Sequence, residues 1–386
     1  MSTRDEPIYL DHNATTPIDP AVVEAMAECY QSHMGNPASQ HSTGRRARKI
    51  LEDSRERMIT LLGVNTANLD DYQLVLTSGG TEANNLALIG LAGEPPGNIV
   101  LSSIEHPSVA APADYLTTRG FEIRVAPVGP DGCLRTEDVE PLLDDQTRLV
   151  TVMLGNNETG VMQPVERVYE ICRDRKIPIH TDAVQVVGKL PVDVEHLGVS
   201  ALSFSAHKFH GPRGIGGLLF RSDAHLQPIL FGGFQQSGLR PGTVPVALPV
   251  GMLRALELSQ SDPNRIERMF ELRRQFEQTI LDRCPCAQIV GHKTKRLPHT
   301  SNIAFEGLDR QAILMALDVA GVACSTGSAC ASGSSDPSPV LLAMGLQKAI
   351  VDGSIRFSLG AQTTQEEIIE ACRRIINVIN TLENQK

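Results

Sequence analysis

Short apolar runs alternate with amphipathic stretches between about Gln73 and Arg221. The runs are rich in Val, Ile and Leu and are bounded by turn residues, which is typical of buried strands. Strands are therefore predicted at 74–76, 98–101, 123–126, 149–154, 177–180, 199–204 and 215–220. Stretches between them, such as 81–91 and 164–176, have helical periodicity. This alternation predicts an α/β fold with a mostly parallel sheet covered on both faces.

The pattern changes after about Pro249. A charged helix, a strand, a second helix and a last strand are predicted at 264–282, 302–305, 310–320 and 355–359. The final helix begins at Gln365 behind a capping box of Thr364 and Glu367. Its apolar stripe is expected to pack in a core and contains Ile368, Ile369, Cys372, Ile375, Ile376 and Ile379. We expect a large domain over 17–257 and a smaller α+β domain formed by 1–16 and 258–386.

Composition narrows the class of protein. The 386 residues are 41% hydrophobic and 21% charged, as in a soluble globular protein. The net charge of −10, without a basic block, argues against nucleic acid or an anionic membrane as a partner. No apolar run approaches membrane-spanning length and no signal-peptide core is present, so a cytoplasmic protein is expected. The eight cysteines are scattered, which predicts free thiols and no metal site.

Lys208 stands at the end of the run 199–204, just before a glycine-rich segment at 211–217. An amine at the mouth of a buried strand, beside hydroxyl and imidazole groups, is placed to form a Schiff base with pyridoxal 5'-phosphate. Taken alone, the residue is also compatible with a solvated surface lysine. Polar clusters follow the predicted strands at 77–81, 156–158, 181–182 and 205–208. Because ligands bind at the carboxyl ends of such strands, these clusters should meet in one crevice.

Two further positions suit the same cofactor. Asp182 ends a predicted strand, and its carboxylate could keep a pyridine nitrogen protonated; the alternative is an aspartate that caps the next helix. Gln185 could hydrogen-bond the hydroxyl of the ring. His106 follows another strand and could stack on the ring and carry a proton, or be an ordinary loop histidine.

The segment Ser78-Gly79-Gly80-Thr81 lies between a strand and a helix. Small residues at a helix N-terminus let backbone N–H groups approach a phosphate. A plain glycine turn capped by Thr81 is the alternative. Arg356 alternates with apolar residues on a predicted strand; its planar fork suits a substrate carboxylate, unless it points to solvent.

Cys330 has almost only small or polar neighbours, which predicts a mobile loop over about 324–338 rather than a core. An exposed cysteine on a flexible tether can accept a group in one place and deliver it in another. Its thiolate must be the reactive form. Cys324 is expected to pack in a short strand, with a disulfide to Cys330 as the alternative.

Taken together, several segments closely resemble cysteine desulfurases of the NifS/IscS branch. The resemblance runs in order along nearly the whole chain, through 9–17, 35–39, 77–85, 156–160, 180–185, 205–217, 239–243 and 325–330. It implies a fold-type-I, pyridoxal-phosphate-dependent homodimer in which Lys208 binds the cofactor, Asp182 and Gln185 contact its ring and His106 stacks on it. It also implies that Gly80, Thr81, Ser205, His207 and, from the second subunit, Thr243 hold the phosphate.

The same resemblance implies the reaction. Asn157 and Arg356 would bind the carboxylate of L-cysteine, and Cys330 would take its sulfur as a persulfide while L-alanine is released. A sulfur-acceptor protein, in iron–sulfur cluster assembly or another thiolation pathway, would then be a partner that the sequence does not identify. Selenocysteine lyase activity is the alternative within the same family. A non-enzymatic sulfur-trafficking protein is disfavoured because Lys208, Asp182 and Cys330 are all present.

Overall fold

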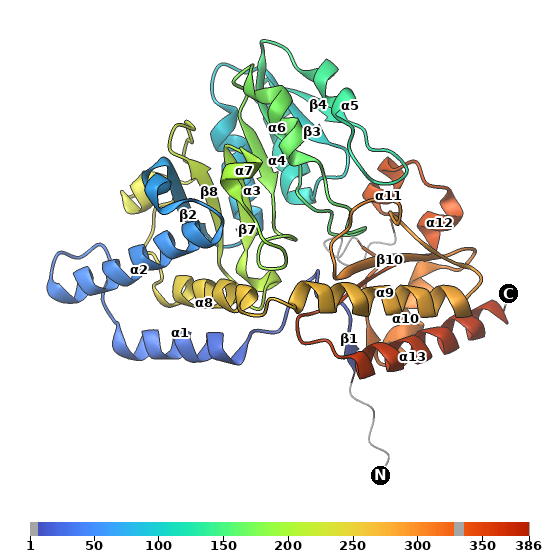
Figure 1. Cartoon of the computed structure of the whole chain (residues 1–386). Helices are drawn as coiled ribbons and strands as arrows, with labels where there is room; N and C mark the ends of the chain where they lie inside the picture. Colours follow the sequence, from blue (N-terminus) through green and yellow to red (C-terminus); the bar gives the residue numbers. More distant parts are fainter. Residues whose placement is uncertain (1–6, 328–335, 386) are drawn as a thin grey trace.

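A seven-stranded sheet with helices on both faces forms most of the computed structural model, which describes residues 7–327 and 336–385 (Figure 1). The strand order is β2 (Tyr72–Thr77), β8 (Gly216–Arg221), β7 (Ala201–Ser205), β6 (Ile179–Asp182), β5 (Thr147–Thr151), β3 (Asn98–Ser102) and β4 (Glu122–Ala126). All bonded pairs from β4 to β7 are parallel, while β8 runs antiparallel to both of its neighbours. The predicted mostly parallel sheet is therefore confirmed.

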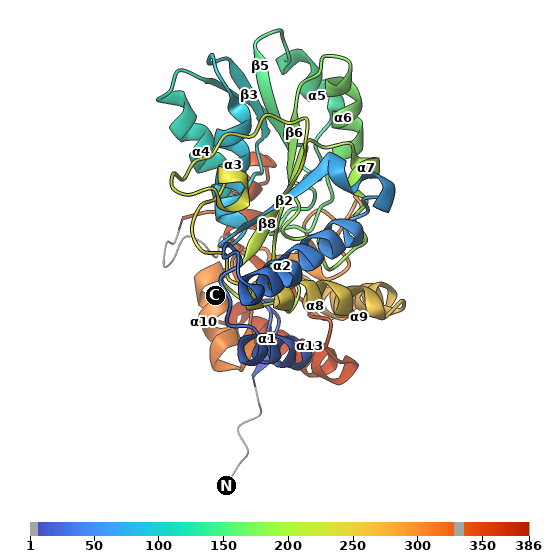
Figure 2. The same cartoon turned by 90° about the vertical axis from the view of Figure 1, so that its left-hand side faces the viewer.

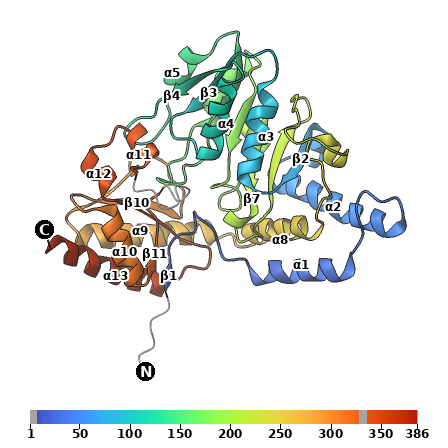
Figure 3. The same ribbon diagram turned by 180° about the vertical axis from the view of Figure 1, so that it is seen from behind.

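Helices cover this sheet on its two faces, which Figures 1 and 3 show from opposite sides. One face carries α3 (Gly80–Ala92) and α4 (Pro107–Thr117), and the other carries α6 (Val165–Arg173) and α7 (Val194–Leu197). The predicted helices 81–91 and 164–176 correspond to α3 and α6. Shorter pieces are α5 (Thr136–Val139) and the 3₁₀ turns Thr66–Asp71, Glu140–Leu142, Ala206–Lys208 and Gln235–Gly238.

Three helices that the sequence pattern did not predict lie along one end of the sheet: α1 (Pro20–Ser32), α2 (Ser42–Leu61) and α8 (Ala247–Ser261). Both α1 and α2 pack against α8, as the side view in Figure 2 shows. Only Val22 and Cys29 are buried in α1, so its apolar stripe is too short for a clear helical period. The domain boundary near residue 257 stays a prediction, and α8 runs through it without a break.

The rest of the chain forms a second group of elements at the other end. They are β1 (Ile8–Tyr9), α9 (Arg265–Arg283), β9 (Ala287–Ile289), β10 (Thr300–Phe305), α10 (Arg310–Val319), β11 (Val322–Ala323), α11 (Pro339–Ala343), α12 (Lys348–Asp352), β12 (Ser354–Ser358) and α13 (Gln365–Glu383). The strands β12, β10 and β9 form an antiparallel sheet, and β1 pairs in parallel with β11. The capping box of α13 is present as predicted.

This second group has a hydrophobic core of its own, which joins β1 to side chains of α9, β10, β12 and α13. The stripe of α13 is buried in it, with one correction: Ile369 is 56% exposed. One residue turns a helix by about 100°, so Ile369 lies off the face that Ile368 and Cys372 share. Cys324 directly follows β11, which ends at Ala323, and packs against this core.

The N-terminal segment crosses from this core to the main sheet. It leaves β1, forms a bridge between Asp11 and Ser358, and then runs beside the end of β7. There the backbone N–H of Thr16 donates to the carbonyl of His207 at 2.9 Å. Residues from the start of the chain are therefore held next to Lys208. Among the described residues, none of the helices has the length and apolar character needed to cross a membrane.

Candidate active site

A cavity of about 780 Å³ opens at the carboxyl ends of the parallel strands. Ten of the predicted site residues line it: Gly80, Thr81, His106, Asn157, Asp182, Gln185, Ser205, His207, Lys208 and Arg356. The predicted convergence of the polar clusters is therefore confirmed. Thr243 is exposed and is not among the lining residues. Cys330 lies outside the described residues, while Gly327 and Asp336 both line the cavity.

The amine of Lys208 is held by the N-terminal segment. Lys208 ends the 3₁₀ turn that follows β7, and its Nζ donates to the carbonyl oxygens of Asn13 and Ala14 at 2.6 and 2.8 Å. The adjacent His207 ring lies 3.1 Å from the hydroxyl of Thr15. Burial of the ring, and secondly the positive charge of Lys208, lowers the pKa of His207 to about 4. At neutral pH His207 is therefore uncharged and can both donate and accept a hydrogen bond.

A chain of hydrogen bonds joins Asp182 to His106 across the cavity wall. Asp182 lies at the end of β6, and one carboxylate oxygen accepts from the backbone N–H of Val184, so it does cap the next turn. The other oxygen accepts from Asn84 Nδ2 at 2.7 Å. The same amide donates to the hydroxyl of Ser108 at 2.8 Å, which lies 2.7 Å from His106 Nδ1.

His106 is the N-cap of α4 rather than an ordinary loop residue. Its Nδ1 accepts from the backbone N–H of Ser108 at 3.1 Å. A ring nitrogen that accepts a hydrogen bond carries no proton, so the neutral imidazole holds its proton on Nε2.

The N-terminus of α3 lies at another part of the cavity. The cap of this helix is Gly79, with no capping side chain, so the predicted alternative of a Thr81 cap is wrong. A Cβ added to Gly80 would come within 2.7 Å of Val184 Cγ2, and only glycine lets the backbone lie this close. The buried hydroxyl of Ser205 has no hydrogen-bond partner within the described part of the chain. The first turn of α3 and the hydroxyl of Ser205 therefore lie at the cavity with hydrogen-bond donors that are unpaired among the described residues, a combination that suits an anion.

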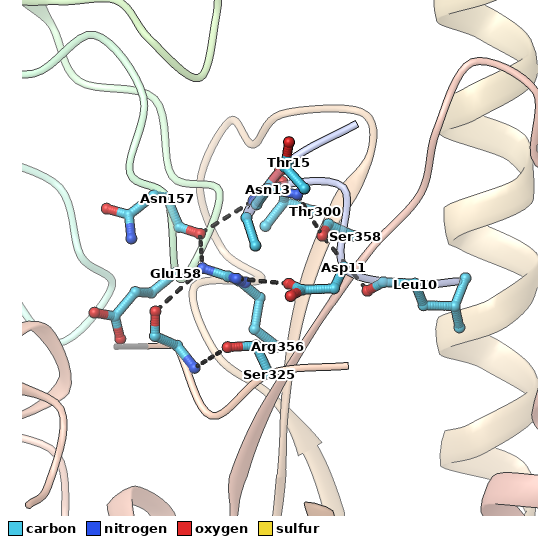
Figure 4. Close-up of polar contacts among 12 residues, drawn as sticks. Leu10, Asp11, Asn13, Thr15, Asn157, Glu158, Thr300, Ser325, Arg356 and Ser358 are labelled. Carbon is cyan, nitrogen blue, oxygen red and sulfur yellow. Dashed lines mark hydrogen bonds and ion pairs between the residues drawn. The ribbon is translucent and has the colours of Figure 1, made fainter. Parts of the chain in front are cut away.

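Arg356 is buried on β12 and only 1% exposed, so the alternative of a solvent-directed arginine is wrong. Figure 4 shows its guanidinium between the N-terminal segment and the loop after β5. Nη2 donates to Asp11 at 2.7 Å, and Nη1 donates to the carbonyls of Asn157 and Gly327 at 3.2 and 3.1 Å. Its Nε is buried without a partner among the described residues.

Two buried carboxyl groups in the cavity wall have raised pKa values. Burial raises the pKa of Glu105 to about 8, although it accepts from Ser102 and from the backbone N–H of Met153. Burial also raises the pKa of Glu158, which accepts from Ser338 at 2.6 Å. Among the described residues, no group of three or more His, Cys, Asp or Glu side chains is arranged to hold a metal ion.

Sequence reasoning missed Asn13, Asn84 and Ser108. Asn13 connects the most partners: its amide donates to Asn157 and Thr300, and its carbonyl accepts from Gln185 and Lys208. Both asparagines lie inside segments that carry the family resemblance, but an asparagine there predicts a cap or a turn equally well. Only the spatial neighbours reveal their role.

Comparisons with known proteins show which family this chain belongs to. Residues 8–370 match the model of the aminotransferase class-V family. A cysteine desulfurase IscS from Dictyoglomus turgidum is 39% identical, over 98% of this chain and 97% of that relative. The solved NifS-like protein from Rickettsia africae superimposes with a TM-score of 0.88 at 31% identity, over 97% of this chain and all of the other. A structure of SspA in complex with cysteine gives a TM-score of 0.80 at 32% identity, over 92% and 99% of the two chains.

The α/β architecture with a mostly parallel central sheet, which the chain shares with the NifS-like structures, is that of fold-type-I enzymes. The matches show that the chain belongs to the aminotransferase class-V family, among its cysteine desulfurases. The predicted resemblance is confirmed, and the names of these relatives do not favour the selenocysteine lyase alternative.

Proposed function

We propose that this enzyme converts L-cysteine to L-alanine and transfers the sulfur to Cys330, using pyridoxal phosphate held at Lys208. The observation that carries the proposal is the meeting of the Lys208 amine, the Asp182 carboxylate and the His106 imidazole in one cavity. The relatives named cysteine desulfurase, and the related structure that contains cysteine, support L-cysteine as the substrate.

The residues of the cavity fit the cofactor. The unpartnered hydroxyl of Ser205, the N-terminus of α3 and the close approach at Gly80 suit a phosphate. The Nζ of Lys208 suits an aldehyde, and Asp182, held by Asn84, suits a pyridine nitrogen. When bound, pyridoxal phosphate supplies an electron-withdrawing ring that stabilises negative charge on the Cα of the substrate.

Each protein group then has a definite task. The carboxylate of Asp182 would pair with the ring nitrogen and keep that nitrogen protonated. The Nζ of Lys208, which lines the cavity, would take the Cα proton of the substrate. His106 is oriented by Ser108 with its proton on Nε2, where a proton can be given or taken. Arg356 and Asn157 would bind the substrate carboxylate.

The sulfur transfer balances without an external oxidant. The Cβ–S bond of cysteine breaks and a new S–S bond forms with the Cys330 sulfur. The two electrons of the broken bond stay with Cβ, which gains a proton and becomes the methyl group of alanine. Cys330 changes from a thiol to a persulfide, so carbon is reduced and sulfur is oxidised in the same step.

We also propose that the working enzyme is a homodimer that delivers its persulfide sulfur to a separate acceptor protein in the cytoplasm. Phe231 and Phe234 are 87% and 96% exposed, close in sequence to the exposed Thr243. Large exposed aromatic side chains of this kind mark a surface that a partner covers. A second copy of the chain would bury these two side chains, and the Thr243 of each copy would then reach the cavity of the other copy.

The test is to incubate the purified protein, loaded with pyridoxal phosphate, with L-cysteine and to measure alanine and sulfide. Cys330→Ala should keep the visible absorption of the bound cofactor but lose turnover, because only the sulfur acceptor is removed. Lys208→Ala should lose the normal absorption of the lysine-bound cofactor. Full desulfuration by Cys330→Ala would show that the assigned nucleophile is wrong.

A further inference from the structure

A second buried amine, that of Lys189, lies close to the cavity without lining it. Lys189 follows Gln185 by four residues, in the turns between β6 and α7, and its side chain is 5% exposed. Lysine is almost never buried to this degree unless it is paired. The reaction proposed above gives this amine no task.

The partners of Lys189 are amides rather than acids. Its Nζ donates to Gln185 Oε1 at 2.8 Å and to Asn13 Oδ1 at 3.3 Å. Within residues 7–327 and 336–385 no carboxylate forms an ion pair with it. Burial, and then the positive charges of Lys208 and Arg356, holds the pKa of Lys189 well below its ordinary value. A buried amine without an acid is costly, so its hydrogen bonds must do something specific.

Those hydrogen bonds determine how the amide of Gln185 is oriented. A lysine amine donates to Oε1, and the Nε2 of the same amide donates to the carbonyl of Asn13 at 3.0 Å. The contact with Asn13 disfavours the flipped amide, because a flip would place Oε1 against the carbonyl oxygen, and the amine of Lys189 holds Oε1 as a second point of attachment. One N–H of Gln185 is then left for a ligand in the cavity that it lines.

We propose that Lys189 is a positioning residue that fixes the Gln185 amide with its N–H toward the cavity, so that the site selects a cofactor with an acceptor oxygen on its ring. This inference rests on the proposed function, because the oxygen is the ring oxygen of pyridoxal phosphate. Lys189 acts through Gln185 and does not touch the cofactor. Without Lys189 only the carbonyl of Asn13 holds the amide, so the amide can turn its N–H away from the cavity for about half of the time.

The test compares two ligands on the apoprotein: pyridoxal phosphate and 3-deoxypyridoxal phosphate, which lacks the ring oxygen. Dissociation constants are measured by quenching of protein fluorescence, without any measurement of turnover. Lys189→Met should weaken the binding of pyridoxal phosphate about twofold and leave the binding of the deoxy analogue unchanged, since an amide that presents its N–H for about half of the time raises the apparent dissociation constant by that factor. Lys293→Met, at an exposed lysine, is the matched control and should change neither constant.

A double substitution separates positioning from general structural damage. Gln185→Ala should weaken pyridoxal phosphate binding, and Lys189→Met should add nothing in that background, because its effect passes through the amide. Met leaves the buried Oε1 of Gln185 without its donor, so a modest fall in the melting temperature is expected and is measured beside the two dissociation constants. If Lys189→Met fails to fold, the dissociation constants of pyridoxal phosphate and the deoxy analogue are compared in Lys189→Gln instead.

The proposal is overturned if Lys189→Met weakens both ligands equally or if its effect multiplies with that of Gln185→Ala. If the wild-type apoprotein binds neither ligand, both this proposal and the proposed function are wrong. Wild-type binding of pyridoxal phosphate with an unchanged ratio in Lys189→Met would overturn this proposal alone.

Discussion

Ser205→Ala should have opposite effects on the apoprotein and on cofactor binding. The hydroxyl of Ser205 is buried at the end of β7 and has no hydrogen-bond partner among the described residues. A buried polar group without a partner destabilises a fold, so its removal should leave the thermal midpoint of the apoprotein unchanged or raise it. If the same hydroxyl donates to the phosphate of the cofactor, its loss should weaken binding.

The expected weakening follows from the charge of the acceptor. A hydrogen bond to a charged group contributes about 1.5–3 kcal/mol, which corresponds to a loss of ~10-fold to ~150-fold in affinity. The assay is a fluorescence titration of the apoprotein with pyridoxal phosphate, combined with thermal unfolding of the same samples. Binding should weaken while the melting temperature does not fall.

Ser203→Ala is the matched control on the same strand. Its hydroxyl lies 2.9 Å from His180 Nε2, so its removal leaves a buried ring nitrogen unpaired at a cost of about 1–3 kcal/mol. This variant should melt at a lower temperature and bind pyridoxal phosphate as the wild type does. The reasoning is refuted if Ser205→Ala destabilises the apoprotein as much as Ser203→Ala, or if the two variants bind the cofactor equally well.

Two further outcomes follow from the described contacts. Asn84→Ala removes the donor to Asp182, so the variant should bind pyridoxal phosphate about tenfold more weakly and show a shifted pH midpoint in the visible absorption of the bound cofactor; an unchanged midpoint would contradict the role of Asn84. For His180, burial lowers the folded-state pKa to about 3 while the unfolded value stays near 6.5, so the stability from its neutral ring is complete above pH 6.5 and is lost as the pH falls toward 3. His180→Gln, which does not titrate, should reduce the slope of unfolding free energy against pH by about 1.4 kcal/mol per unit in that window, measured by urea unfolding at a series of pH values.

Local sequence signals predicted the elements that depend on neighbours along the chain. The apolar runs around β5 and β7, and the capping box at Thr364, need only a few adjacent residues to be recognised. The antiparallel direction of β8 was not predicted. The short connection between β7 and β8 has no room for the crossover that a parallel partner needs, yet sequence pattern alone does not reveal which strands pair.

The same distinction between local signals and contacts made in the folded chain applies to the candidate site. Lys208 and Asp182 were found because each lies at or shortly after the end of a buried strand, and strand ends of a parallel sheet share one edge. The partners that orient them were not found. Asn84 and Asn13 acquire their contacts through helix packing and through an N-terminal segment that reaches Lys208 from far away in sequence.

What the sequence determined by itself is the set of reactive groups and the strands that present them, because alternation, capping and strand-end polarity are read over short distances. Tertiary structure alone decided how those groups are oriented. The pairing of β1 with β11 carries Asn13 to Lys208, Gln185 and Lys189, and hydrogen-bond partners decide which ring nitrogen of His106 and which N–H of Gln185 are left for the cavity. Hydrogen-bond direction depends on partners that meet only after the chain has folded, so no local pattern could have specified it.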